Sequence, residues 1–584
     1  MNCRDFSAPR TTRALLDYNH CAMNSDSPLP SHASHSGRGW WLALLLSLLT
    51  SLAIVAPFFW LGMASGHDFE FHVASWLDVA AQWREGTVFP RWAEWPNCGY
   101  GEPRFIFYPP FSWLLGPALS LVVPWKYVPV AFILLVQTSA GLSAFALARG
   151  WVSDYAALFA AVSYSANPYA LVTIYFRSDY AELLACAFLP LLILMAFELT
   201  GALKNRRRSV PRTAALFALV FAAVWLSNAP AGVLATYSAA LLFCWAAVRE
   251  RSFKPLVLGA TAMAVGFALA GFYVIPAAYE QRWVNIEQIL SSGLRPNVNF
   301  LYTMVNDAEH TFFNWIASTI AVAMIVMAGL AAISSDQGAP PEREAVKRGH
   351  LVLAAAATLL MLRPSAIVWR TLPQLRFVQF PWRWAAILAV PFSYFLAAAV
   401  ARRRFAWLWI AATIALLTGT AAFLVQETWW DSADIPSLEA ALTQGKGFEG
   451  TDEYDPRGDD HYDLPVPAPR VKVLSAAEDL TATDATVLVD RWFAEDRQIR
   501  VTSREPVRLE LRLLNYPAWE VQVNRRTVTP GQVPDTAQMV VDVPAGESRV
   551  TVRFTRTVDR TVGGMVSATA LLSVLAMLAS TSRR

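Results

Sequence analysis

Apolar runs close to twenty residues long recur along the chain and constrain its fold more than any other feature. A helix needs about 20 predominantly apolar residues to cross the hydrocarbon of a bilayer. The composition agrees, because only 16% of the residues are charged, against roughly 25% in soluble globular domains. We therefore predict a polytopic α-helical membrane protein.

The basic residues predict how these runs alternate across the membrane. Lys and Arg gather at a few connections, and placing all of them in the cytoplasm satisfies the positive-inside rule. These connections contain Arg149, 204–208, 249–254, 343–348, 402–404 and 583–584. About twelve spans then alternate consistently, with both termini in the cytoplasm: 40–63, 127–148, 154–173, 181–200, 212–227, 229–248, 256–276, 312–334, 349–364, 382–400, 405–424 and 562–580.

One further apolar run, residues 105–124, is expected to stay outside the membrane. Counting it as a span would move every later basic cluster to the outer side, and its prolines suit a short interfacial helix better than a spanning one. Its helix-breaking residues are Pro109, Pro110, Gly116, Pro117 and Pro124. Residues 64–125 are therefore predicted to form one long external loop with juxtamembrane helices.

The rest of the chain divides by composition. Residues 1–38 lack apolar periodicity and are expected to be a disordered cytoplasmic tail, followed by an uncleaved signal anchor. Residues 39–425 would form the transmembrane domain. Residues 426–560 show period-two alternation between turn signals, which predicts an extracytoplasmic antiparallel β-sandwich. Residues 561–584 would supply the last span and a short cytoplasmic tail.

Several classes of chemistry lack their sequence signatures. The five cysteines show no CxxC spacing, so neither a disulfide framework nor a cysteine metal site is expected. The sequence also contains no Walker loop, dinucleotide fingerprint, HExxH or GxSxG motif. ATP-driven transport and nucleotide-sugar chemistry of the soluble type therefore have no visible support.

Two carboxylates and two imidazoles crowd the start of the external loop, directly after the first span. They are His67, Asp68, Glu70 and His72. In a helix Asp68 and His72 would share a face, and in a strand Asp68, Glu70 and His72 would lie on one side. Either geometry suits a general base or part of a metal site. The alternative is helix capping and loop solvation, although charge at a membrane edge costs free energy.

A second acidic group follows the short turn before the fourth span. Glu182 opens an otherwise apolar run, 181–197, where a carboxylate is costly unless Arg177 or a substrate hydroxyl offsets it. The alternative is capping of the helix N-terminus by Ser178 or Asp179. The two roles can coexist.

Arginines also lie in the predicted external loops, against the charge bias. They are Arg91, Arg104, Arg282, Arg295, Arg370, Arg376 and Arg383. Arginine forms paired hydrogen bonds to phosphate oxygens, so a lipid phosphate or pyrophosphate is a natural ligand. Aromatic faces nearby, such as that of Tyr108, would suit a sugar ring. The alternative is anchoring of Arg, Trp and Tyr in the interfacial belt.

Seven motifs together resemble a known group of membrane proteins. They occupy residues 66–72, 86–92, 99–103, 107–110, 380–383, 453–456 and 516–519. With these motifs the chain resembles the bacterial YfhO-like group and the related "6-pyruvoyl-tetrahydropterin synthase-related" membrane proteins. More broadly, its acidic first loop and second acidic site are similar to those of the GT-C superfamily of membrane glycosyltransferases.

The resemblance implies an inverting transfer of a sugar from a polyprenyl-phosphate donor to a glycan, lipid or protein acceptor on the outer face of a bacterial plasma membrane. Asp68 would deprotonate the acceptor hydroxyl, and Glu182 or else Asp179 would be the second acidic site. The expected substrate-binding residues are His67, Glu70, His72, Arg91, Arg104, Tyr108, Arg177, Arg376 and Arg383. Some GT-C enzymes use a divalent cation and others do not, so a metal is left open. Membrane lipids are also expected as partners, and nucleic acid is not.

The main rival hypothesis is a non-catalytic protein, either a transporter or flippase of lipid-linked glycans or an assembly scaffold. A transporter should carry ionisable residues inside several spans, with some repeat symmetry. Here the ionisable residues gather at one predicted outer face instead. This distribution favours surface chemistry on a lipid-borne substrate.

Overall fold

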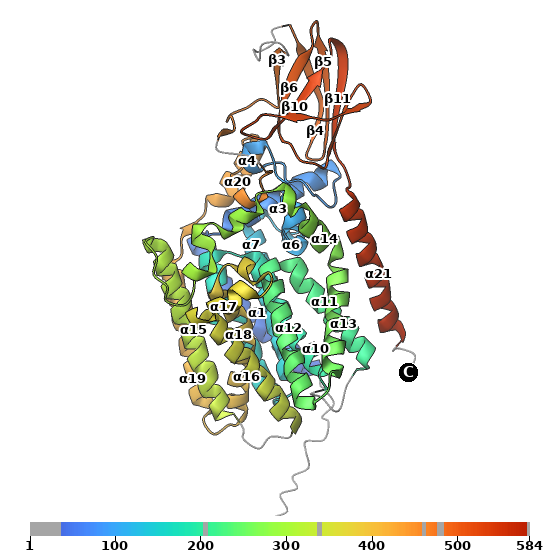
Figure 1. The fold of residues 1–584 in the computed structure, drawn as a ribbon. Helices are drawn as coiled ribbons and strands as arrows, with labels where there is room; N and C mark the ends of the chain where they lie inside the picture. Colours follow the sequence, from blue (N-terminus) through green and yellow to red (C-terminus); the bar gives the residue numbers. More distant parts are fainter. Residues whose placement is uncertain (1–36, 202–207, 336–340, 458–462, 476–483, 581–584) are drawn as a thin grey trace, which may run out of the picture.

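The computed structural model describes residues 37–201, 208–335, 341–457, 463–475 and 484–580. The predicted cytoplasmic tail, apart from its last two residues, lies outside these ranges. The described chain forms a helical bundle with a β-rich part at one end, joined by a layer of short helices (Figure 1).

The bundle consists of long apolar helices. Within the described ranges, ten helices are long and apolar enough to cross a bilayer, or up to twelve if each of two bent pairs is one span. This confirms the prediction of about twelve spans. Some spans combine two helices that follow one another, such as α1 with α2 and α8 with α9. The helices that make up the spans are α1 (Gly37–Val55), α2 (Phe58–Leu61), α7 (Val128–Ala148), α8 (Asp154–Ser165), α9 (Pro168–Val172), α10 (Tyr180–Leu199), α11 (Val210–Ser227), α12 (Ala229–Glu250), α13 (Lys254–Leu269), α14 (Gly271–Glu280), α15 (Ala308–Ser334), α16 (Pro341–Met361), α17 (Ala366–Thr371), α18 (Ala385–Ala401), α19 (Ala406–Glu427) and α21 (Val558–Ser580).

Two of the spans are bent sharply where they approach the β-rich end. Helix α13 and the segment Gly271–Trp283 meet at 76°, and α16 and the segment Arg363–Thr371 meet at 89°. Short 3₁₀ and π turns then connect the bundle helices at this end. They are η1 (Trp125–Tyr127), η2 (Thr173–Arg177), η3 (Gln281–Trp283), η4 (Ile286–Leu290), η5 (Ser292–Leu294), η6 (Pro296–Val298), η7 (Arg363–Ser365), η8 (Leu375–Val378) and η9 (Pro381–Trp384).

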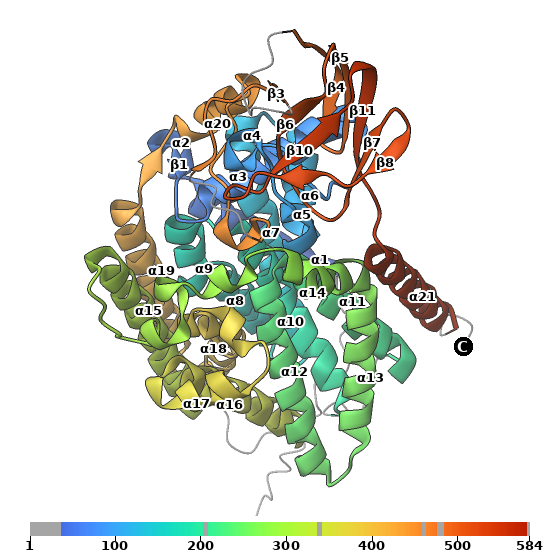
Figure 2. The same ribbon diagram turned by 45° about the horizontal axis from the view of Figure 1, so that its top comes forward.

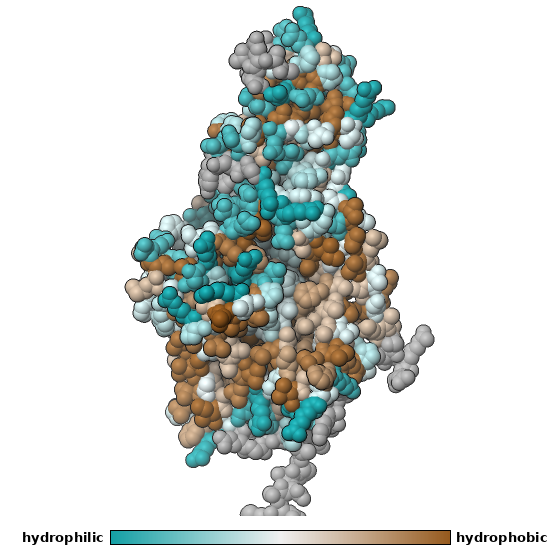
Figure 3. Space-filling model, viewed as in Figure 1, coloured by the Kyte–Doolittle hydropathy of each residue, from teal (hydrophilic) through white to brown (hydrophobic). Residues whose placement is uncertain are grey.

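The polarity of the surface follows this architecture. Hydrophobic side chains gather over the helical body, and hydrophilic ones gather at its lower end and over most of the β-rich part (Figure 3). The basic connection between α18 and α19, residues 402–404, lies at the end of the bundle opposite the β-rich part (Figure 1). This is the arrangement that a positive-inside assignment requires if the β-rich part is external.

The first long connection forms a platform of short helices between the bundle and the β-rich part. They are α3 (Phe69–Glu85), α4 (Pro96–Gly99), α5 (Arg104–Phe107) and α6 (Pro110–Ser120). Helix α6 has 11 residues, and at 1.5 Å per residue it covers only about half of the ~30 Å of bilayer hydrocarbon. This agrees with the prediction that residues 105–124 do not cross the membrane.

The C-terminal region is a two-sheet antiparallel structure, as its alternating sequence predicts. The strand orders are β3-β6-β10-β9 and β4-β5-β11-β7-β8. The alternation is visible in β6, where Val507, Leu509, Leu511 and Leu513 are buried and the residues between them are not. These strands are β3 (Val471–Ser475), β4 (Thr486–Phe493), β5 (Asp496–Ser503), β6 (Val507–Leu514), β7 (Trp519–Val523), β8 (Arg526–Val528), β9 (Gly531–Gln532), β10 (Gln538–Val543) and β11 (Gly546–Phe554).

The β-rich part shares its core with the platform. Trp92, Tyr100, Ile106 and Phe107 of the first connection belong to the same buried apolar cluster as the inner faces of the two sheets. Burying such large side chains stabilises the contact by roughly 2–3 kcal/mol each. The platform is therefore held from above by the β-rich part and from below by the bundle.

Two further contacts tie the segment after α19 to the end of the first span and to the platform. Strand β1 (Met63–Ala64), at the exit of the first span, pairs with β2 (Trp430–Asp431), at the exit of α19. Helix α20 (Asp434–Thr443) then packs beside α3 (Figure 2). The predicted start of the external domain at residue 426 falls at the end of α19.

Candidate functional site

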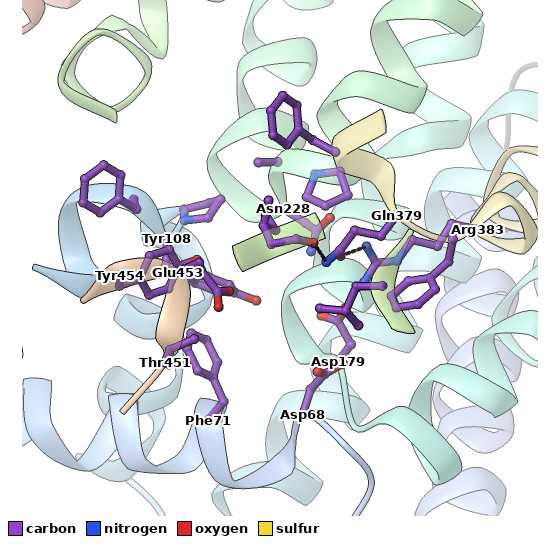
Figure 4. Close-up of a pocket in the computed structure, with 18 of the residues that line it drawn as sticks. Asp68, Phe71, Tyr108, Asp179, Asn228, Gln379, Arg383, Thr451, Glu453 and Tyr454 are labelled. Carbon is purple, nitrogen blue, oxygen red and sulfur yellow. Dashed lines mark hydrogen bonds and ion pairs between the residues drawn. The ribbon is translucent and has the colours of Figure 1, made fainter. Parts of the chain in front are cut away.

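A cavity of about 1160 Å³ lies where the bundle, the platform and the segment leading into the β-rich part meet. Ligand sites for small molecules commonly occupy about 300–1,000 Å³, so this one can hold a large ligand or two. Its lining comes from α3, α5 and the two residues after it, the turn before α10, helices α11 to α14, the 281–310 connection with the start of α15, the 373–383 connection and residues 448–454. Figure 4 shows side chains from these segments turned toward one space.

The turn before α10 places Asp179 of the second acidic group in the lining of this cavity, whereas Glu182 is buried and is not part of the described lining. Turn η2 ends at Ser178, which has φ 53°, and Asp179 then caps α10 by accepting a hydrogen bond from the Glu182 backbone N–H at 2.9 Å. A side-chain acceptor at this position satisfies one of the open N–H groups of the helix start. The capping alternative therefore holds for Asp179, and it leaves the second carboxylate oxygen for other contacts.

The same turn locks the start of the platform. The Ser178 hydroxyl donates to the Ala64 carbonyl at 2.7 Å and accepts from the Gly66 N–H at 3.1 Å. A Cβ on Gly66 would lie 2.4 Å from the Phe176 carbonyl oxygen, so the two segments approach more closely than another residue allows. The acidic stretch after the first span is thus held against the second acidic group.

Arg177 is the centre of a cluster that joins both acidic groups. Its Nη1 lies 2.6 Å from Glu182 Oε2, and its Nη2 lies 2.6 Å from Asp179 Oδ2 and 3.4 Å from Asp68 Oδ2. Arg383 approaches the same carboxylates, with Nε 3.2 Å from Glu182 Oε2 and Nη2 3.7 Å from Asp179 Oδ2. We call Asp68, Arg177, Asp179, Glu182 and Arg383 the acid–arginine cluster.

Two further groups complete the contacts of the buried carboxylates. The Tyr169 hydroxyl donates to Glu182 Oε1, and His72 Nε2 lies 3.5 Å from Asp179 Oδ1. Burial raises the pKa of the Asp179 carboxyl, but Arg177 and His72 outweigh it and hold that pKa below its usual value. Asp179 therefore stays charged as a structural partner of the arginines.

Asp68 differs from the other two carboxylates of the cluster in its exposure. Its side chain is 41% exposed, whereas Asp179 and Glu182 are buried. It precedes α3 without capping it, and its Oδ2 has a long contact to Arg177. Asp68 is thus the carboxylate of the cluster that faces the cavity most openly (Figure 4).

The structure pairs the imidazole of the acidic stretch differently from the sequence expectation. Because α3 begins at Phe69, His72 turns into the protein and meets Asp179 rather than Asp68. His67 and Glu70 line the cavity. Burial lowers the pKa of His67 and raises that of Glu70.

The predicted arginines separate into two groups. Arg104, Arg177 and Arg383 line the cavity, as does Tyr108. Arg91 and Arg376 are not part of the described lining, so the expected contact of these two with a ligand in this cavity is not supported. The Arg91 backbone N–H donates to Glu495 in the β-rich part, and its guanidinium packs on Phe89. Arg376 is exposed and packs on Phe377, as interfacial anchoring requires.

The cavity has an apolar half and a polar half. The apolar side chains come mainly from α12, α14 and the 373–383 connection, and include Trp225, Val233, Phe267, Val274, Ile289, Phe377 and Phe380. The polar half contains seven carboxylates among its described lining residues: Asp68, Glu70, Asp179, Asp307, Glu309, Glu449 and Glu453. A ligand with an apolar chain and a polar head matches this division.

Sequence reasoning missed the part of the lining that comes from residues 448–454. The motif at 453–456 was recognised only as part of a family resemblance, and nothing local places it beside α3. Within the described ranges, no group of three His, Cys, Asp or Glu side chains is arranged to hold a metal ion. In the acid–arginine cluster, guanidinium groups occupy the positions between carboxylates.

The fold and cavity define a polytopic membrane protein with a large partly apolar site at the end of the bundle that carries the β-rich part. Residues 105–428 match the model of the 6-pyruvoyl-tetrahydropterin synthase related domain, described as a membrane protein. This match covers more than half of the chain. The protein therefore belongs to that family, as its motifs indicate.

Solved structures give weaker similarities. Arabinofuranosyltransferase AftD from Mycobacteria matches at 16% identity and TM-score 0.40 over 66% of this chain and 28% of that one. Oligosaccharyltransferase AglB from Archaeoglobus fulgidus, in complex with an inhibitory peptide and a dolichol-phosphate, matches at 11% identity and TM-score 0.38, over 71% of this chain and 57% of that one. ArnT from Cupriavidus metallidurans bound to undecaprenyl phosphate matches at 12% identity and TM-score 0.32, over 80% of this chain and 98% of that one.

These TM-scores, all below 0.5, do not establish a common fold or activity. The chain spans less than two thirds of the length of the first two proteins. No curated protein matches the chain in sequence.

Proposed function

We propose that this protein is a membrane glycosyltransferase that moves a sugar from a polyprenyl-phosphate donor to an acceptor hydroxyl in the cavity. The observation that carries the proposal is the acid–arginine cluster, in which Asp68 alone of three carboxylates is half-exposed to the cavity. In this proposal the cavity opens at the outer face of a bacterial plasma membrane, and the position of the basic connection 402–404 at the opposite end of the bundle supports this orientation.

The division of the cavity supports a lipid-linked donor. Side chains such as Trp225, Phe267 and Phe377 offer an apolar surface to the first isoprene units, beside the polar half where a sugar would lie. Arg383 lies in the same connection as Phe377 and Phe380, so a guanidinium stands at the boundary of the two halves. A phosphate at that boundary would meet a cation suited to its oxygens.

The proposed reaction is a single displacement. The acceptor oxygen forms a bond to the anomeric carbon, and the bond between that carbon and the phosphate oxygen breaks. Asp68 takes the proton of the acceptor hydroxyl, and the polyprenyl phosphate leaves with the electron pair. Arg177 and Arg383 hold the carboxylates of Asp179 and Glu182 in place, so that the two guanidinium groups are paired with the two buried carboxylates and Asp68 is left as the third.

The substitution Asp68→Asn tests this role. It keeps the shape of the side chain and removes one long, half-exposed ion pair, which contributes about 1 kcal/mol or less to stability. Loss of a general base lowers the rate by roughly 10²–10⁴. We expect loss of the glycan product in a deletion strain complemented with Asp68→Asn, at normal protein level and with unchanged translocation of the lipid donor.

Glu287→Gln is the matched control, because Glu287 is exposed in the 281–310 connection and is not part of the described lining. It should restore the product fully. An intact product with Asp68→Asn would rule out the base assignment. Loss of donor translocation with either variant would favour the transporter hypothesis instead.

A further inference from the structure

Residues 447–457, which we call the strap, close the cavity from the side of the β-rich part. One edge of the strap is bonded to the platform: Phe448 N–H donates to the Trp95 carbonyl at 2.9 Å, and Cys98 N–H donates to the Phe448 carbonyl at 2.8 Å. The Thr451 N–H donates to Glu102 Oε2 at 3.0 Å. The strap is therefore part of the platform rather than a free loop.

Its far end is bonded to the 281–310 connection. The Asn285 N–H donates to the Asp455 carbonyl at 2.9 Å, and the Arg457 N–H donates to the Trp283 carbonyl at 3.0 Å. A Cβ on Gly450 would lie 1.6 Å from the Asn97 side-chain oxygen, so a larger residue there would displace the Asn97 side chain from its hydrogen bond to Asp455. These contacts fix the direction of the side chains between them.

The inward side chains of the strap form an acidic wall opposite the acid–arginine cluster. Glu449, Thr451, Glu453 and Tyr454 line the cavity, and Figure 4 shows Glu453 directed into the space across from Arg383. Burial raises the pKa of Glu453 to about 7, as expected for a carboxyl group held at the edge of a partly apolar cavity.

The three arginines of the described lining already donate to protein oxygens. Arg104 donates to Glu102 at 2.5 Å, Ser75 at 3.1 Å and Thr451 at 3.0 Å. Arg177 and Arg383 contact Asp179 and Glu182, as described above. An anionic group placed beside the strap would therefore face carboxylates without an uncommitted guanidinium from this part of the lining.

An aromatic surface lies beside the acidic wall. The rings of Phe71 and Tyr108 are 4.7 Å apart in an edge-to-face arrangement, and Arg104 lies 4.4 Å from the Phe71 ring centre. Both rings line the cavity next to Glu453 and Tyr454 (Figure 4). Sugar rings present apolar C–H faces and polar hydroxyl edges, which match an aromatic ring beside carboxylates.

We propose that the strap and the Phe71–Tyr108 surface bind the acceptor, that the acceptor is a neutral sugar residue, and that Glu453 determines this specificity by accepting hydrogen bonds from its hydroxyl groups. The inference rests on the proposed function, because it assigns the acceptor side of the same cavity. It gives the donor the opposite side, where the apolar half and Arg383 lie. The β-rich part then contributes to specificity through the strap as well as bracing the platform.

Binding of matched sugar probes to the purified full-length protein tests the inference without a donor. The probes are methyl hexopyranosides and the corresponding methyl hexuronosides, which differ by a single carboxylate. We expect the wild type to bind the neutral probes at least tenfold more tightly than the uronosides. Glu453→Ala should weaken binding of the neutral probes at least tenfold, because the hydrogen bonds from the sugar hydroxyl groups to the Glu453 carboxyl group are lost.

A second variant and a control separate binding from folding. Glu453→Gln keeps the side-chain size, and we expect it to reduce the difference in affinity between the neutral and the anionic probes. Glu547→Gln changes an exposed glutamate of β11 and should bind as the wild type does. Equal binding of the two probe classes by the wild type, no probe binding, or unchanged affinity in both Glu453 variants would overturn the inference.

The proposed function is tested separately in the same preparations by binding of undecaprenyl phosphate. Glu453→Ala should leave that affinity unchanged. If undecaprenyl phosphate does not bind and Asp68→Asn leaves the glycan product intact, the glycosyltransferase proposal fails. If undecaprenyl phosphate binds and Asp68→Asn abolishes the product, but the Glu453 variants are unaltered, only the acceptor assignment fails.

Discussion

The contact between Glu280 at the end of α14 and Arg560 at the start of α21 gives a stability prediction of calculable size. Arg560 Nε and Nη2 each lie 2.7 Å from a different Glu280 oxygen, and the Tyr516 hydroxyl of the β-rich part donates to the same carboxylate at 2.7 Å. The Glu280 side chain is 0% exposed and that of Arg560 is 3% exposed. We consider the substitution Arg560→Met.

The magnitude follows from the two charge-assisted bonds. Each contributes roughly 1.5–3 kcal/mol, and removal of one partner from a buried ion pair costs about 3–5 kcal/mol because the other charge stays buried. We therefore expect Arg560→Met to destabilise the protein by about 4 kcal/mol. This is a large part of the roughly 5–15 kcal/mol that stabilises a typical domain.

The assay is thermal and denaturant unfolding of the purified protein, followed by tryptophan fluorescence. Trp283 and Trp519 lie close to Tyr516 and Phe554, respectively, so they are among the 23 tryptophans whose surroundings change when this contact breaks. Arg553→Met is the control, since Arg553 is exposed on β11 and its ion pair with Asp496 is worth about 1 kcal/mol or less. The double variant Glu280→Leu/Arg560→Met should recover much of the lost stability, because it removes both charges of this pair together.

Two results would refute this reasoning. The first is an Arg560→Met protein that unfolds at the same temperature and denaturant concentration as the wild type. The second is a double variant that is no more stable than Arg560→Met, which would mean that the loss comes from packing and not from an uncompensated carboxylate.

Two further predictions concern the platform. Burial raises the pKa of Glu94 from 4.5 to about 7. The protonated Glu94 carboxyl group therefore stabilises the folded state fully below pH ~4.5, and this stabilisation is lost as the pH rises through 7. The loss is about 3 kcal/mol at most. The unfolding temperature of the wild type should therefore fall between pH 5 and pH 8, and that of Glu94→Gln should fall less. A wild type that gains stability over this range, or a variant whose unfolding temperature falls as steeply as that of the wild type, would contradict this prediction. Gly66→Ala places a Cβ against the Phe176 carbonyl and should lower the rate of the proposed sugar transfer at least tenfold by displacing Asp68 from Arg177. Gly329→Ala, where no atom lies within 4 Å of the new Cβ, is the control, and equal activity of the two variants would show that the close approach at Gly66 is not required.

The sequence predicts those features of the fold that depend on local pattern. Apolar runs near the bilayer thickness locate the spans, and period-two alternation locates strands such as β6 and β11. The proximity of Arg177 to Glu182 is also local, because a turn of five residues brings them together. The acidic stretch around Asp68 could be recognised as a candidate site from its position alone.

Contacts between distant segments could not be read from the sequence. Thr451 and Glu102 are 349 positions apart, and only the docking of the β-rich part brings the strap to the platform. Arg91 and Arg383 both follow aromatic, proline-containing stretches, yet tertiary packing sends one to Glu495 and the other to the cavity. For the same reason His72 contacts Asp179 and not the expected Asp68, since the start of α3 determines which way its ring points.

The pairing of β1 with β2 has a bearing on how the protein is made. Met63 and Ala64 are synthesised early, but their partners Asp431 and Trp430 emerge only after nearly all of the bundle has been produced. Until then the acidic stretch after the first span has no strand to hold it, and the wall containing Glu453 does not yet exist. A ribosome that stalls directly after α19 would leave a membrane-inserted chain whose acidic cavity is open on the side of the strap, so the cavity is complete only after translation has passed residue 457.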